Sequence, residues 1–168
     1  CVEYRFVPVT HTFNFDDWDV GSTSAADALV AEDFWTWGFT STTAYDLTDF
    51  SIRLDRSPSG PDDFLIELAV NGSSSFASVL IFDFEDSGNG VNFLNVDLSS
   101  FDAITDADFR LTAFNSESSA GTFDLELLPN STNGIIITGE VSAIPLPAPA
   151  LMLLASLLGL GALRFRRA

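Results

Sequence analysis

Apolar and polar residues alternate in short runs along most of the first 142 positions of the chain. In one such run, Phe109, Leu111 and Ala113 would face one side while Arg110 and Thr112 face the other. This period of two predicts half-buried antiparallel strands. The runs with strand character are Val2–Val9, Thr12–Phe15, Asp33–Phe39, Tyr45–Leu54, Asp63–Val70, Phe76–Phe84, Val91–Leu98, Phe109–Phe114, Gly121–Leu128 and Gly134–Val141.

Turn-forming residues separate these runs, and only Ala25–Glu32 has helical character. Asn71-Gly72 joins two apolar runs and predicts a hairpin, as does Asp86–Gly90. About ten short strands with glycine-rich turns are typical of sandwich folds. We therefore predict an all-β fold over residues 1–142, an antiparallel β-sandwich with jelly-roll-like connectivity.

The pattern changes in residues 143–168, which we treat as a separate C-terminal unit. No charged residue occurs from Ala143 to Leu163, and the run is apolar on every side, which disfavours a core helix. Pro149 suits the first position of a helix, and a continuous helix from there to Leu163 would span ~22 Å. We expect one C-terminal transmembrane helix that holds the chain temporarily, with an ordinary anchor as the alternative.

Prolines precede this helix. Pro145, Pro147 and Pro149 bias the segment Ile144–Ala148 away from helix and toward an extended, polyproline II-like conformation. An extended segment at the membrane surface exposes its peptide bonds to a protease. The alternative is a stiff spacer that lifts the domain off the bilayer.

Three arginines follow the helix, Arg164, Arg166 and Arg167. The positive-inside rule places such a cluster in the cytoplasm, where the arginines would act as a membrane stop. Residues 1–142 are therefore expected on the outer side of the membrane.

The sequence Ile144, Pro145, Leu146, Pro147, Ala148, followed by the apolar helix and the arginines, resembles the PEP-CTERM sorting signal of Gram-negative bacteria in its VPLPA-type variant. Ile144 stands where that variant has Val, and the Glu between prolines of the main motif is absent. The resemblance covers residues 144–168 only. It implies that an exosortase, a membrane-embedded transpeptidase-like enzyme, recognises and cuts the tail. It also implies export to the outer cell surface or extracellular matrix after transient anchoring in the inner membrane.

Charge limits the partners of the exported part. The chain has 24 acidic and seven basic residues, no lysine and a net charge of −17. Such a charge repels nucleic acid and anionic lipid surfaces, and it attracts divalent cations or basic partners. The acids are scattered, so a solvated surface is the leading explanation for them.

Few residues suit catalysis. His11 is the sole histidine, and no serine lies in a nucleophile-elbow pattern, so an incidental histidine is the favoured interpretation. The single cysteine, Cys1, and the absence of lysine remove most covalent chemistries. Cys1 is a lipidated N-terminus, a residue that follows a cut, or the edge of a fragment; the missing Met and signal peptide favour a processed or truncated start. We predict a non-enzymatic protein with no resident cofactor.

Two binding sites are candidates. Asp102, Asp106 and Asp108 form an oxygen-rich cluster that could hold Ca²⁺, although exposed turn acids are the favoured interpretation. Trp35 and Trp37 would share one face of a strand and could stack on sugar rings, although core packing is favoured for them. The sequence thus predicts a sorted surface or matrix protein. The alternatives are a carbohydrate-binding or adhesive module that contacts polysaccharide, a self-assembling matrix subunit and a secreted hydrolase.

Overall fold

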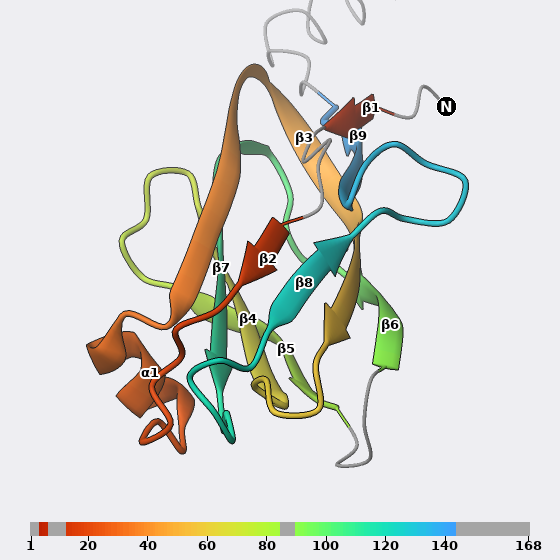
Figure 1. The fold of residues 1–168 in the computed structure, drawn as a ribbon. Coiled ribbons are helices and arrows are strands. Elements are labelled where there is room, and N and C mark those ends of the chain that lie inside the picture. Colours follow the sequence, from red (N-terminus) through yellow and green to blue (C-terminus); the bar gives the residue numbers. More distant parts are fainter. Residues whose placement is uncertain (1–3, 7–12, 85–89, 144–168) are drawn as a thin grey trace, which may run out of the picture.

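The computed structural model of the chain describes residues 4–6, 13–84 and 90–143. These residues form one antiparallel sheet that curls into two facing layers (Figure 1), which confirms the predicted antiparallel β-sandwich in its coarse form. Its elements are β1 (Tyr4–Phe6), β2 (Phe13–Phe15), α1 (Ala25–Ala31), β3 (Phe34–Arg56), β4 (Asp63–Val70), β5 (Ala77–Asp83), β6 (Gly90–Asp97), β7 (Ile104–Phe114), β8 (Phe123–Glu126) and β9 (Ile135–Val141).

The strand β3 belongs to both layers. Its first part pairs with β7, from Phe34 opposite Thr112 to Thr40 opposite Asp106. Its second part pairs with β6 on one side and with β9 and then β8 on the other. Figure 1 shows β3 rising to the top of the view, bending there and returning. The remaining strands of the first layer are β4 and β5, and β1 and β2 extend the second.

The two predicted strands Asp33–Phe39 and Tyr45–Leu54 are therefore one strand of 23 residues. The register shifts between Thr40 and Tyr45, where the strand bends from one layer into the other. The bend contains a Ser/Thr run that breaks the alternation of apolar residues, which is why the sequence predicts a gap there. Threonine nevertheless favours extended backbone, so the strand continues through the bend.

The core lies between the two layers and is rich in aromatic side chains. Among the residues that the structure describes, the fully buried phenylalanines are Phe50, Phe64, Phe109 and Phe123. As predicted, Phe109, Leu111 and Ala113 face inward. Thr112 is also buried, because α1 packs against β7 on the opposite face of that strand.

The two predicted hairpins differ in outcome. Asn71 (φ 52°) and Gly72 (φ 72°) form the turn between β4 and β5, and the Ser73 N–H donates to the Val70 carbonyl at 3.0 Å. That hairpin is confirmed. The hairpin predicted at Asp86–Gly90 is wrong, because β5 pairs with β4 whereas β6 pairs with β3. Glycine-rich residues indicate a chain reversal but do not determine which strands share a ladder.

None of the helices in the described ranges is long and apolar enough to cross a membrane. The predicted transmembrane helix and its arginines lie outside the described residues.

Two loops close one end of the sandwich through contacts that require glycine. The Ser57 N–H donates to the Thr122 carbonyl at 3.0 Å, and the Ser118 N–H donates to the Ser59 carbonyl at 3.1 Å. A Cβ added at Gly60 would lie 2.2 Å from the Thr122 carbonyl oxygen. A Cβ added at Gly121 would lie 2.2 Å from the Ser59 carbonyl oxygen. The two backbones therefore approach each other only because both positions lack a side chain.

We predict that Gly121→Ala lowers the free energy of unfolding by roughly 1–3 kcal/mol, the cost expected of forced overpacking. Gly21→Ala is the matched control, since the three heavy atoms nearest its Cβ, at 3.3 to 3.8 Å, would all belong to the Asp19 side chain and none to the backbone. Urea unfolding of both variants measures the difference. Equal stability of the two variants would contradict the close approach.

Candidate functional site

Trp35 and Trp37 share one face of β3, as predicted, and that face is turned toward the core. The Trp37 ring stacks on Trp35, with centroids 4.5 Å apart, and on Phe109, with centroids 5.4 Å apart. A third stacked contact joins Trp37 to Phe50 at 5.7 Å. Both tryptophans are half-buried and pack against the buried cluster. These are the contacts of core packing, the interpretation that the sequence favoured, rather than of an open platform for sugar rings.

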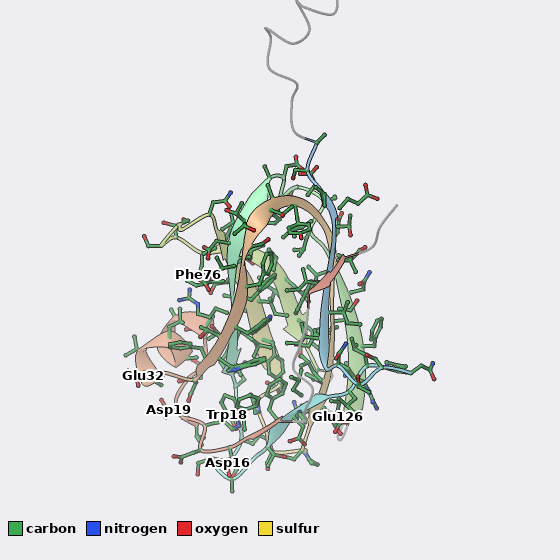
Figure 2. All side chains as sticks on the ribbon, turned by 90° about the horizontal axis from the view of Figure 1, so that it is seen from above. Asp16, Trp18, Asp19, Glu32, Phe76 and Glu126 are labelled. Atoms are coloured by element: carbon green, nitrogen blue, oxygen red, sulfur yellow. The ribbon has the colours of Figure 1, made fainter. Side chains whose placement is uncertain are left out.

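A small cleft lies beside Trp35, between the segment that follows β2 and the start of β3. Its volume is about 300 Å³, and its described lining is aromatic on the inside and acidic at the rim. The lining residues are Phe15, Trp18, Phe34, Trp35, Phe123, Leu111, Ala31, Asp16, Asp17, Glu32 and Asp33. In Figure 2, Asp16, Trp18, Asp19 and Glu32 lie at this end of the molecule, near α1.

Two acidic residues around this cleft, Asp33 and Asp19, accept hydrogen bonds from within the protein. Asp33 Oδ2 accepts from the Asp19 N–H at 3.0 Å and ties the segment after β2 to the start of β3. The Asp19 carboxylate accepts from the Gly21 N–H at 3.0 Å and from the Ser22 hydroxyl at 3.2 Å. These two carboxylates therefore shape the loop from within.

The structure does not bring Asp102, Asp106 and Asp108 together as a ligand set. Among the residues described, no three His, Cys, Asp or Glu side chains are grouped so that they could hold a metal ion. Asp106 instead fixes the β4–β5 turn: its Oδ1 accepts from the Gly72 N–H at 3.0 Å, and its Oδ2 accepts from the Thr40 hydroxyl at 3.2 Å. Asp106 and Asp108 lie two residues apart on β7, and Asp102 precedes that strand.

Several predicted residues lie outside the described ranges. They are Cys1, His11, the sorting motif Ile144, Pro145, Leu146, Pro147 and Ala148, and the arginines Arg164, Arg166 and Arg167.

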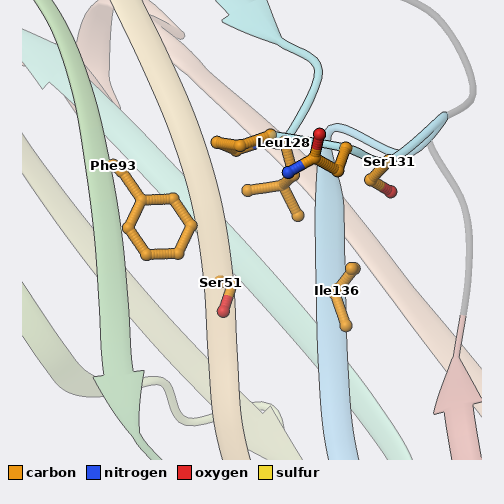
Figure 3. A pocket seen from close by; sticks show the side chains of 7 residues that line it. Ser51, Phe93, Leu128, Ser131 and Ile136 are labelled. Carbon is orange, nitrogen blue, oxygen red and sulfur yellow. The ribbon is translucent and has the colours of Figure 1, made fainter.

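A second concavity, larger than the cleft beside Trp35, lies on the outer face of the second layer, and the sequence did not predict it. We call it the Phe93 groove; its volume is about 420 Å³. Its described lining is Ser51, Phe93, Leu128, Pro129, Asn130, Ser131 and Ile136. Figure 3 shows Ser51, Phe93 and Ile136 on three neighbouring strands, with the segment from Leu128 to Ser131 across one end.

The local sequence explains how the groove forms. Val96 and Leu98 on and beside β6 point into the core, so the alternation turns Phe93 outward, where it is 56% exposed. Ser51 and Ile136 are direct cross-strand partners on β3 and β9 and form the floor. The sequence held one signal for an exposed aromatic ring here, since Phe93 and Leu94 are adjacent in one half-buried strand. Two successive apolar residues of a strand cannot both face the core.

Burial and hydrogen bonding move the pKa of several carboxyl groups in opposite directions. Partial burial raises the pKa of the Asp33, Asp62 and Asp124 carboxyl groups above the ordinary value of 3.8. Arg56 opposes this effect at Asp62, with an Arg56 Nη1 to Asp62 Oδ2 distance of 3.5 Å. Hydrogen bonds from Ser142 and from the Ala103 N–H lower the pKa of Asp46.

Comparisons with known proteins assign no family to this chain. It matches no family model, and no curated protein sequence matches it. Among solved structures, it is similar to the F5/8 type C domain of a Bacteroides fragilis protein, with a TM-score of 0.35 and 12% sequence identity. That match covers 82% of this chain and 96% of the other. A likeness at this TM-score assigns neither a fold family nor a function.

We predict that Trp37→Ala lowers the free energy of unfolding by roughly 3–5 kcal/mol, the range for truncating a core aromatic. Phe34→Ala is the matched control, because Phe34 lies on the opposite face of the same strand and is 40% exposed. Its expected cost is below about 1 kcal/mol. Denaturant unfolding checks both values, and an unchanged stability of Trp37→Ala would show that Trp37 is not part of the core.

We predict that stability rises as the pH falls from neutral toward about 4. The folded state binds protons on Asp33, Asp62 and Asp124 more tightly than the unfolded chain does, so protonation favours folding in this window. Asp46 has the opposite effect, because its lowered pKa means that its charged form stabilises the folded state. That stabilisation is lost as the pH falls below the ordinary value of 3.8. Circular-dichroism melting curves over this pH range measure the effect.

In the same experiment, Asp124→Asn should flatten the rise, because one of the three responsible carboxyl groups is gone. A melting temperature that falls steadily between neutral pH and about 4 would contradict the prediction.

Proposed function

We propose that this chain is an exported, non-enzymatic surface or extracellular-matrix protein that is sorted through its C-terminal tail. An exosortase-like membrane enzyme would recognise Ile144–Ala148 while the helix holds the chain in the inner membrane and the three terminal arginines remain in the cytoplasm. This proposal includes the jelly-roll-like connectivity, the transmembrane helix and the location at the surface of a Gram-negative bacterium.

The observation that carries the proposal is the position of the last described strand relative to the motif. β9 pairs with the second part of β3 from Tyr45 opposite Val141 to Ile52 opposite Ile135. Just beyond β9, the Ser142 N–H donates to the Ala44 carbonyl at 2.9 Å, and the Ser142 hydroxyl donates to the Asp46 carboxylate. The sandwich is therefore closed two residues before the motif begins.

A cut within or after the motif would remove none of these contacts. The released domain would keep every described strand pair, including the pairing of β1 with β9. A sorting tail must be removable in this way, because its loss would otherwise unfold the cargo. The acidic surface also supports export as a soluble product, since a net charge of −17 opposes association and adhesion to anionic lipid.

Two alternatives for the released domain remain within this proposal. One is a carbohydrate-binding or adhesive module. The packing of Trp35 and Trp37 against the core does not favour a site there, whereas the Phe93 groove offers an exposed aromatic ring. The other is a self-assembling matrix subunit that uses a sheet edge. β5 ends the strand order of its layer, and Ile81 on it is 72% exposed.

Processing tests the proposal. We predict that Pro145→Ala/Pro147→Ala leaves the full chain uncut and membrane-bound in a Gram-negative host that carries an exosortase, because the segment before the helix could then become helical. The matched control is Pro58→Ala/Pro129→Ala, which replaces two exposed prolines in loops of the sandwich. Intact-mass measurement of membrane and released fractions reports whether residues 144–168 remain. Normal processing of the motif variant, or an unchanged chain that keeps Arg167 in its mature form, would overturn the proposal.

A further inference from the structure

We propose that the Phe93 groove binds a neutral sugar ring of a glycan. This inference deepens the carbohydrate-binding alternative of the proposed function. It does not depend on how the tail is processed, so either proposal can fail without the other.

The walls of the groove are held in place by the protein itself. Arg53 on β3 donates from Nη1 to the Leu127 carbonyl at 2.8 Å and thereby fixes the start of the β8–β9 loop. Within that loop, the Leu128 N–H donates to the Asn133 carbonyl at 2.8 Å, and the Ser131 N–H donates to the Leu128 carbonyl at 3.0 Å. Because the loop is ordered before any ligand arrives, binding would cost little loop entropy.

The groove offers an apolar surface with a polar group on each side of it. Phe93 is 56% exposed and stands beside Arg53, its cross-strand partner. The Ser51 hydroxyl donates its hydrogen to Asn95 Oδ1 at 2.8 Å, so its lone pairs can still accept a hydrogen bond. The Ser131 hydroxyl accepts from the Asn133 N–H at 3.0 Å, so its own hydrogen can still be donated.

This arrangement matches the two chemistries of a sugar ring. One face of a pyranose carries C–H groups that can lie on an aromatic ring, and its edge carries hydroxyls that both donate and accept. One acceptor at Ser51 and one donor at Ser131 can pair with such hydroxyls. The volume of about 420 Å³ lies within the range of small-ligand sites and would hold one or two sugar rings.

Charge decides in favour of a neutral glycan. The described residues that line the groove carry no charge, whereas the chain as a whole carries 24 acidic residues. An anionic polysaccharide would be repelled by the net charge of −17. A cationic ligand would find no carboxylate in this lining to pair with.

The position within the sheet disfavours a peptide that binds by adding a strand. Such peptides pair with an exposed sheet edge. The floor residue Ser51 lies on β3, which is already paired with β6 on one side and with β9 on the other. Among the described strands, β6 pairs with β3 alone, but the groove extends from Phe93 over β3 and β9, away from the free edge of β6, and presents side chains.

Affinity electrophoresis of the full chain tests this inference, with a zwitterionic detergent that has no sugar headgroup. The probes are three neutral polysaccharides (dextran, a mixed-linkage β-glucan and galactomannan) and one anionic polymer, polygalacturonate. We expect retardation by at least one neutral polymer and none by polygalacturonate. Phe93→Ala should weaken that binding about tenfold or more, and Ser131→Ala roughly fivefold.

Phe34→Ala is the matched control, because it removes an exposed phenylalanine from the other layer and should bind as the unchanged chain does. A circular-dichroism spectrum of each variant establishes that it is folded. Binding to none of the neutral polymers, equal binding to polygalacturonate, or binding that survives Phe93→Ala would each overturn the inference.

Discussion

The pairing of β3 with both layers is the constraint on which the rest of the structure depends. One strand of 23 residues contributes to the ladder with β7 before the bend and to the ladders with β6, β9 and β8 after it. The bend brings Trp37 and Phe50, which lie on different parts of this strand, into stacking contact with each other and with Phe109. The two layers are therefore joined covalently and through one shared aromatic cluster.

Three of the chain's few basic residues, Arg53, Arg56 and Arg110, make contacts within the sandwich. The described arginines of the sandwich core and its loops each hold a separate part of the molecule. Arg56 is buried and donates to the Ser57 and Pro58 carbonyls, Arg53 holds the β8–β9 loop, and Arg110 pairs with Glu67 at 2.7 Å while lying over the Phe76 ring. Because these three arginines make internal contacts, carboxylates supply most of the charge on the described surface, whereas the described lining of the Phe93 groove carries no charge.

Much of the fold could be predicted because alternation reports burial directly. Strands β4, β6 and β9 lie within one residue of their predicted limits, and the Asn71-Gly72 turn forms as its residues require. The single strand through the Ser/Thr bend, the pairing of β6 with β3 and the burial of Thr112 under α1 were not predictable. Each depends on which distant segments meet, and a local pattern carries no information about that. The Phe93 groove was missed for the same reason, since its lining comes from three strands and one loop.

The sequence by itself determined the antiparallel β class, most strand limits and the excess of acidic residues, because composition and periodicity are local properties. Only the tertiary structure decided the role of the aromatic residues. Trp35 and Trp37, for which the sequence favoured core packing but left a sugar platform open, pack inward, whereas Phe93, to which the sequence assigned no role, faces solvent. The physical reason is that a side chain's partners are set by the face of the sheet it occupies and by the layer opposite, and both are fixed only when the sheet curls.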